Sequence, residues 1–179
     1  MTDQYLENLR YPIGKFSHPT NYSTEFINEC IATIEALPQQ LKTIVEPLNE
    51  VQLNTPYRPE GWTVKQLVHH ISDSHLNSYV RFKWTLTEDN PSIKAYDEKR
   101  WAELSDSKQT PVSVSLSMIK ALHYRWAVLL KSLTTDDWNS TFQHPDFDTP
   151  WHLKMTVAVY AWHSKHHLAH ITNLIEREF

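Results

Sequence analysis

The sequence predicts an all-α protein, a four-helix bundle, and three observations support this fold class. Four long segments repeat apolar residues at helical spacing, no segment shows the sustained alternation of an amphipathic strand, and the chain contains no internal repeat. Apolar residues make up 40% of the 179 positions, which is enough for one substantial core. We therefore expect a single domain over residues 1–179.

The first part of the chain contains a predicted arm and the first helix. Two X-Pro pairs and a glycine favour an irregular arm over residues 1–22. The first helix begins near Ser23 and runs to Pro38, which should kink or interrupt it. The helical pattern then resumes as far as Leu48.

The second helix has the clearest start signal in the sequence. Thr63 followed by Gln66 is a capping box, and the apolar pattern extends from there to about Thr87. A polar connection of more than 20 residues follows over residues 88–110. Its length predicts a crossover along the bundle, between the second and third helices, or a functional loop.

The third and fourth helices complete the predicted bundle. Pro111 suits the first turn of the third helix, which runs to about Leu133. The fourth helix runs from about His152 to the C-terminus. The long second connection permits a topology other than up-down-up-down, and periodicity does not decide between the two.

Composition excludes several classes of function and partner. The formal net charge is −4 and Lys or Arg never form a run, which argues against nucleic acid as a partner. The two glycines cannot form a phosphate-binding loop. No apolar stretch is long enough to span a membrane, and the polar start does not resemble a signal peptide. We therefore expect a cytoplasmic protein, which agrees with the single cysteine, Cys30.

Histidine is the most informative residue type in the chain. Seven of the 11 histidines fall in residues 69–75 and 163–170. His163 and His167 are four residues apart, as are His166 and His170, so each pair shares one face of a helix. His163 and His167 lie within the inward-facing stripe of the fourth helix. This pair therefore predicts a metal site in the bundle.

A third ligand is needed, because two imidazoles hold a metal poorly by themselves. The second helix offers His69, His70 and His75, and facing helices are where bundles build metal sites. His75 lies in the apolar stripe and His70 on its flank, so helical geometry leaves all three open. The alternative is that all these histidines are core or surface residues with ordinary hydrogen bonds. The sequence has no Glu-x-x-His, His-Glu-x-x-His or Gly-x-Ser-x-Gly motif.

Several blocks of the sequence resemble one known family, the DinB superfamily, and specifically its YfiT-like, bacillithiol S-transferase-like branch. The matching segments cover nearly the whole chain: Tyr11–Gly14, the block from Thr55 to His70, Asp73–His75, Asn77–Tyr79, Arg81–Lys83, Tyr96–Lys99, Trp101, Trp162–Ser164 and His166–Thr172. Lys165 departs from the pattern, because relatives have a histidine there, but that position is not a ligand. The resemblance implies a homodimer and a bundle with inverted helix order.

The same resemblance implies which histidines hold the metal. The family ligand on the second helix comes eight residues after the motif tryptophan, and from Trp62 this position is His70. The other two family ligands correspond to His163 and His167. We expect one divalent transition metal per chain, with zinc first and nickel, iron or manganese as alternatives.

Three neutral imidazoles leave positions open for water or substrate, which is typical of a catalytic site. The resemblance implies a metal-dependent thiol S-transferase, which conjugates a small thiol of the bacillithiol type to an electrophile. The alternatives are a hydrolase that uses metal-bound hydroxide and a metal-binding dimer without catalysis. Asp73 is a candidate to orient a ligand imidazole, and Asn77 and Arg81 are candidates to bind substrate.

Overall fold

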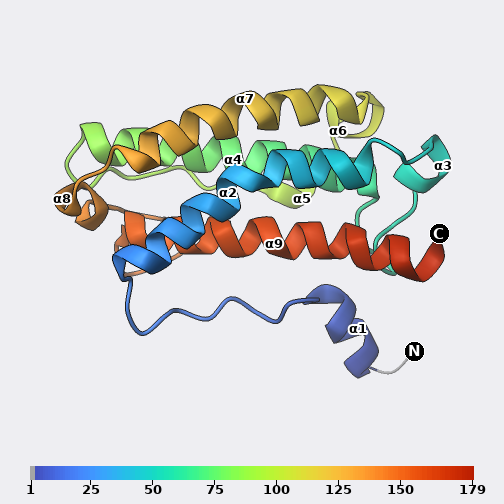
Figure 1. The fold of residues 1–179 in the computed structure, drawn as a ribbon, viewed down its shortest axis with the longest axis horizontal. Coiled ribbons are helices and arrows are strands. Elements are labelled where there is room, and N and C mark those ends of the chain that lie inside the picture. The colour runs from blue at the N-terminus through green and yellow to red at the C-terminus, as the bar shows by residue number, and fades with distance from the viewer. Residues whose placement is uncertain (1–2) are drawn as a thin grey trace.

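Four long helices form the body of the computed structural model, which describes residues 3–179 (Figure 1). They are α2 (Thr24–Val45), α4 (Val64–Thr87), α7 (Val112–Lys131) and α9 (Leu153–Glu178). The predicted four-helix bundle is therefore confirmed. Among the described residues, no helix has both the length and the apolar character that a membrane span requires.

The helices do not follow one another around the bundle. Both α2 and α4 pack against α7 and α9, so α2 and the next long helix, α4, occupy diagonal positions. Figure 1 shows α4 and α7 running in the same direction, joined by a connection that returns along the bundle. The crossover predicted between the second and third helices is this connection. It contains the short helices α5 (Glu98–Trp101) and α6 (Ser105–Gln109).

Local signals explain where the long helices begin. The Ser23 hydroxyl accepts a hydrogen bond from the backbone N–H of Phe26 at the start of α2. The predicted capping box at the start of α4 is present, with Thr63 and Gln66 satisfying each other's backbone N–H groups. These caps fix where α2 and α4 begin.

One expectation about the first 50 residues needs correction, and the expectation that Pro38 would kink or interrupt the first helix is met by a change of direction without an interruption. The arm predicted over residues 1–22 contains a helix, α1 (Asp3–Arg10), because no Pro or Gly occurs before Tyr11-Pro12; positions 1 and 2 lie outside the described residues. Residues 11–22 are irregular, as predicted. Pro38 does not interrupt α2, which continues through it to Val45, and Figure 1 shows α2 changing direction along its length.

Short elements complete the loops between the long helices. Helix α3 (Glu50–Leu53) precedes α4, and α8 (Thr135–Asn139) follows α7. Two short strands, β1 (Thr141–Phe142) and β2 (Trp151–His152), pair antiparallel, with Thr141 opposite His152. The sequence did not predict these strands, because two residues are too short for an alternating pattern.

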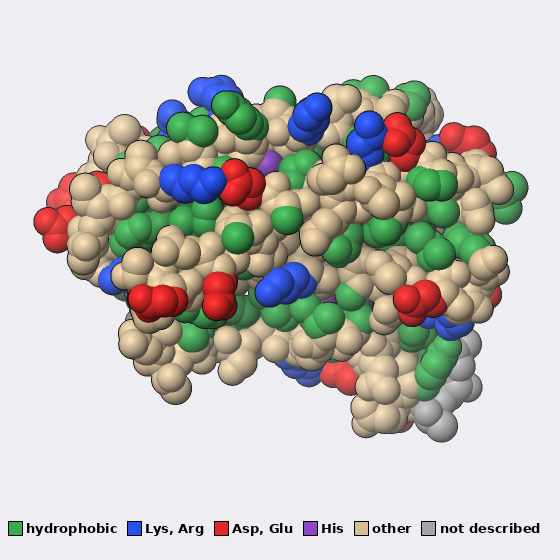
Figure 2. Space-filling model, viewed as in Figure 1, with side chains coloured by type: hydrophobic (Ala, Val, Ile, Leu, Met, Phe, Trp, Pro, Cys, Tyr) green, Lys and Arg blue, Asp and Glu red, His purple; other side chains and the backbone are tan. Residues whose placement is uncertain are grey.

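The apolar core consists of two clusters, one towards each end of the bundle. One cluster contains Ile34 of α2 and Leu122 of α7, and the other contains Leu37 and Ile119 of the same two helices. Between them the sequence places histidines, including the fully buried His75 and His123. Figure 2 shows very little histidine surface on the face seen in Figure 1, although the chain has 11 histidines. Seven of the 11 histidines are buried, so histidine is mostly an interior residue in this protein.

Candidate metal centre

Three histidines converge between α4 and α9. The Nε2 atom of His163 lies 3.3 Å from Nε2 of His70 and 3.1 Å from Nε2 of His167. One ligand atom from each ring lies within 4.8 Å of the others. His70 and His167 are buried, and His163 keeps partial exposure. The structure thus brings together the three residues that the sequence nominated as ligands.

These distances fit a small divalent metal. Metal–nitrogen bonds of about 2.0–2.1 Å in a tetrahedral arrangement place two imidazole nitrogens about 3.3 Å apart. The two measured separations, 3.3 and 3.1 Å, match this value closely. Burial lowers the pKa of His70 to about 4, and it lowers the pKa values of His163 and His167 well below the ordinary value. The rings are neutral at pH 7, which is the protonation state that binds a metal.

Aromatic side chains pack against two of the three rings. The Trp62 ring packs on His70 with centroids 4.6 Å apart, and Tyr160 lies 5.6 Å from His163. The Tyr160 hydroxyl accepts a hydrogen bond of 3.5 Å from Ser74 of α4. These contacts restrict the rotation of the ligand rings and lower the local dielectric.

The other two histidines of α4 have different partners. His75 Nε2 lies 3.0 Å from Nδ1 of His163, on the side of that ring away from His70. His69 Nδ1 lies 2.7 Å from the Ser115 hydroxyl, and its Nε2 lies 3.0 Å from the carbonyl of Thr110. Of the three histidines that helical geometry left open, only His70 presents a ring nitrogen to both His163 and His167.

A second group of histidines lies beside the first on α9. Ligand atoms of His166, His167 and His170 also lie within 4.8 Å of one another. However, Nδ1 of His167 pairs with Nδ1 of His170 at 3.3 Å, and Nε2 of His170 lies 3.1 Å from the carbonyl of Arg10. His166 stacks on Trp162, with centroids 4.4 Å apart. Both nitrogens of His170 are therefore engaged without a metal.

The remaining candidate residues lie further along α4. Asp73 is half-buried, and burial together with the nearby Asp106 raises the pKa of its carboxyl to about 6. Within residues 3–179, no hydrogen bond joins the Asp73 carboxylate to His70; the Asp73 carbonyl accepts one of 2.9 Å from Asn77. Arg81 is buried and donates a hydrogen bond of 3.4 Å to the carbonyl of Lys94 in the crossover.

Sequence reasoning missed the residues behind the ligand rings. His123 of α7 is 1% exposed, its Nε2 lies 2.9 Å from Nδ1 of His75, and its Nδ1 lies 2.6 Å from the carbonyl of Ile34. The available signal was position: His123 falls in the apolar stripe of its helix, next to Leu122. A histidine inside a buried stripe needs polar partners, and another histidine can supply them.

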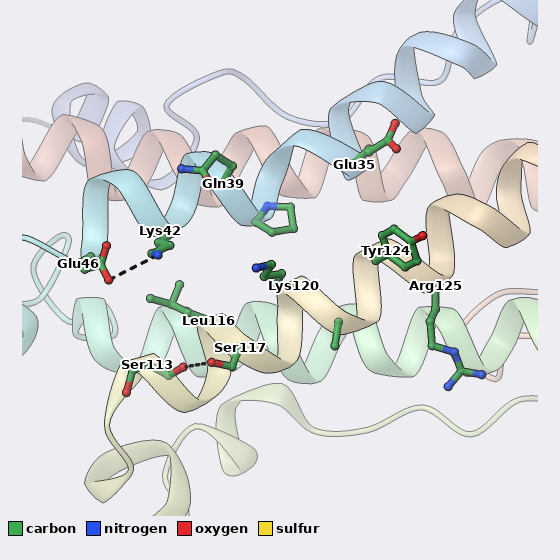
Figure 3. A pocket seen from close by; sticks show the side chains of 12 residues that line it. Glu35, Gln39, Lys42, Glu46, Ser113, Leu116, Ser117, Lys120, Tyr124 and Arg125 are labelled. Atoms are coloured by element: carbon green, nitrogen blue, oxygen red, sulfur yellow. Dashed lines mark hydrogen bonds and ion pairs between the residues drawn. The ribbon is translucent and has the colours of Figure 1, made fainter.

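One surface groove lies away from the three converging histidines. Figure 3 shows a groove of about 840 Å³ between α2 and α7, lined by residues such as Pro38, Lys42 and Tyr124. None of the three converging histidines lines it. The groove and the histidine centre are therefore separate features of the molecule.

Comparison with known proteins identifies the family of this chain. The family model described as the DinB superfamily matches residues 33–171. Proteins from Bacillus cereus (strain AH820) and Bacillus anthracis (strain CDC 684 / NRRL 3495) are each 51% identical over 172 residues, covering 96% of this chain and 98% of the relative. Both are named "Putative metal-dependent hydrolase".

A solved structure shares the fold along nearly the whole chain. It is YfiT from Bacillus subtilis, with a TM-score of 0.92, 48% identity, and coverage of 95% of this chain and 97% of that one. It is described as "a probable metal-dependent hydrolase with an unusual four-helix bundle topology". As the resemblance in the sequence predicted, the chain belongs to the DinB superfamily and is YfiT-like.

Proposed function

We propose that this protein is a metal-dependent hydrolase in which His70, His163 and His167 hold one divalent transition metal. The observation that supports this most directly is the convergence of three neutral imidazole nitrogens at separations of 3.1 and 3.3 Å. The names of the relatives from Bacillus cereus and Bacillus anthracis favour hydrolysis over the thiol transfer that the sequence resemblance implied.

The chemistry follows from the donor set. A divalent metal held by His70, His163 and His167 would supply Lewis acidity, which would lower the pKa of a water molecule to about 7 for use as a nucleophile in hydrolysis. The protein contributes three lone pairs in fixed positions and no compensating negative charge from the ligands. The burial of His70 and His167 keeps bulk water away from two sides of the site.

Residues of α4 beyond His70 are proposed to handle the substrate and a proton. Asn77 and Arg81 lie on the same flank of α4 as His70, and Arg81 could bind a substrate carboxylate through two N–H groups. Asp73, with a pKa raised to about 6, suits proton transfer near neutral pH. Replacing Asp73 with Asn should remove an ionisation near pH 6 from the profile of kcat/KM and leave the metal content unchanged.

Thiol S-transfer is the second candidate, favoured by the sequence resemblance to the bacillithiol S-transferase-like branch. A site with three neutral ligands favours a thiolate over a thiol, and the thiolate is the nucleophilic form. The substrates in this case are a small thiol and an electrophile such as an epoxide. A metal-binding dimer without catalysis is the third possibility.

One experiment separates the three functions. Untagged protein loaded with zinc, nickel, iron or manganese is incubated with a panel of esters and amides, and separately with small thiols and a reporter electrophile. We expect metal-dependent hydrolysis that is lost in H163A and retained in H69F, a variant of a buried histidine that does not contact the three rings. Thiol conjugation without hydrolysis would assign the second function, and no turnover in either assay would favour the third.

Metal identity and assembly need separate measurements. We propose zinc as the resident metal, because imidazole and an open tetrahedral site suit it. Elemental analysis of untagged protein tests this choice, and nickel, iron or manganese in place of zinc would change it.

We also propose a homodimer, and the exposed apolar side chains Val114, Tyr124 and Val128 on α7 support an apolar contact surface. Sedimentation equilibrium measures the assembly, and a monomer would contradict it.

A further inference from the structure

Directional hydrogen bonds connect His163 to the backbone of α2. The Ile34 carbonyl can only accept, so the nitrogen 2.6 Å away, Nδ1 of His123, must carry a proton. In a neutral imidazole the other nitrogen then has a lone pair, so Nε2 of His123 accepts from Nδ1 of His75 at 2.9 Å. By the same logic, Nε2 of His75 accepts from Nδ1 of His163 at 3.0 Å. We call this chain of three rings and the Ile34 carbonyl the inner relay.

The inner relay determines the free nitrogen of His163. Because Nδ1 of His163 carries the proton, its Nε2 has the lone pair, and this is the atom that faces His70 and His167. The relay crosses all four long helices, from His163 on α9 through His75 on α4 and His123 on α7 to α2. His75 and His123 are 0% and 1% exposed, so solvent does not offer them alternative partners.

A shorter chain leads from His167 to the backbone of α1. The Arg10 carbonyl accepts from Nε2 of His170 at 3.1 Å, so Nδ1 of His170 has the lone pair. That nitrogen accepts from Nδ1 of His167 at 3.3 Å, which leaves the lone pair of His167 on Nε2, facing His163. We call His167, His170 and the Arg10 carbonyl the outer relay.

Both relays end on carbonyls that their own helices leave without the usual partner. Within α2 the residue four positions after Ile34 is Pro38, which has no N–H to donate. Arg10 is the last residue of α1, and the N–H of Gly14, four positions on, donates to Tyr11. Each carbonyl is therefore available to a histidine N–H. The proline inside α2 and the end of α1 therefore leave free the two carbonyls on which the relays end.

We propose that His75, His123 and His170 are positioning residues that hold the protons of His163 and His167 on Nδ1, so that both Nε2 lone pairs face the metal. This inference rests on the metal site of the proposed function, but not on the reaction. A ligand histidine usually donates its second N–H to a carboxylate or a carbonyl. In this protein His75 and His170 are the acceptors instead. Their own proton positions are fixed by hydrogen bonds that end on main-chain carbonyls.

The proton positions can be observed directly in the metal-free protein. Full-length protein with ¹⁵N-labelled histidine is examined by long-range ¹H–¹⁵N correlation spectra at pH 8, with assignments from single variants. We expect His163, His123, His75 and His167 to carry their protons on Nδ1, and His170 to carry its proton on Nε2. An Nε2–H form of His163 or His167 would overturn the proposal. This measurement needs neither metal nor substrate, so its outcome is independent of the hydrolase function.

Zinc affinity, measured by competition with a chromophoric chelator, is the second readout. H75F and H170F remove the acceptors of the two relays, and we expect each to weaken zinc binding by about 10–100-fold. H75Q and H170N place an amide oxygen near the lost acceptor nitrogen, so they should recover most of that loss. H69F is the matched control, because His69 is buried on α4 but bonds Ser115 and Thr110 instead.

Each outcome of the affinity measurement has a definite meaning. Affinity in H75F and H170F equal to that of H69F would overturn the proposal, as would equal losses in the Phe variants and the amide variants. If H75F does not fold, H75Q and the H170F/H170N pair decide the result. If wild-type protein binds no zinc, the proposed function fails, and the spectra still decide whether the relays exist.

Discussion

The two candidate ligands on α9 are supported by different parts of the molecule. His163 is held from inside the bundle, through His75 and His123, where packing between the two core clusters fixes every ring. His167 is held from the edge, through His170 and the end of α1. The inner support lies in the buried interior between the four long helices, whereas the outer support depends on α1, a short N-terminal helix outside the bundle.

The largest expected effect comes from removing the ligands themselves. H163A and H167A should each lose more zinc affinity than the roughly 100-fold upper range for supporting residues. Calorimetric titration and elemental analysis measure the loss. Tight zinc binding by H167A but not by H163A would mean that His167 is dispensable as a ligand. His163 and His167 would then differ in their role in metal binding as well as in the residues that support them.

The next largest effect is the acid sensitivity of the metal-free protein. Burial lowers the pKa of His123 to about 4 and that of His170 to about 3, from an ordinary value near 6.5. Above pH 6.5 these rings are neutral in both the folded and the unfolded chain. Their contribution to the free energy of unfolding is therefore at its full value there. Below pH 6.5 the unfolded chain binds protons first, so each ring costs about 1.4 kcal/mol of unfolding free energy per pH unit down to its folded pKa.

Urea unfolding at pH 7, 6 and 5 in the presence of a chelator measures this slope. H123F should reduce the slope by about one proton, or 1.4 kcal/mol per pH unit, because the inner relay then contains one titrating ring fewer. A stability that stays constant from pH 7 to pH 5 would contradict the buried neutral state of the relays.

A smaller effect should follow from deleting residues 1–10. The deletion removes the Arg10 carbonyl and leaves the Nε2–H of His170 without its acceptor. A single hydrogen bond contributes about 0.5–1.5 kcal/mol, so zinc affinity should fall by about 2- to 10-fold. R10A is the control, because the acceptor is a main-chain atom and the substitution keeps it. If the deletion weakens zinc binding as much as H75F does, the outer relay contributes as much to zinc affinity as the inner relay.

The smallest effect is expected for P38A. The new N–H competes with His123 for the Ile34 carbonyl, so zinc affinity should fall a few-fold. The metal-free protein should become more stable, because proline is costly inside a helix. Thermal unfolding and chelator competition measure the two changes, which have opposite signs. Unchanged zinc affinity, or a shift in the ¹⁵N signals of His170 instead of His123, would contradict the role of Pro38 in the inner relay.

Local sequence signals predicted most of the fold. The capping box at Thr63 and Gln66 located the start of α4, because a cap depends only on residues within one turn. The helix α1 was missed, because the turn residues after Arg10 dominated the prediction for the whole arm. The strands β1 and β2 were missed because two residues are too short to show an alternating pattern, and their pairing joins residues that are nine and eleven positions apart.

The sequence alone determined that His163 and His167 share a face of one helix, because their spacing is a property of the helix itself. It could not choose among His69, His70 and His75, which lie on adjacent flanks of α4; family resemblance made that choice. Only the tertiary structure connected His75 with His123, and Pro38 with the histidine centre. The reason is physical. A hydrogen bond between two helices depends on how the helices pack, whereas the apolar repeat in the sequence describes each helix separately.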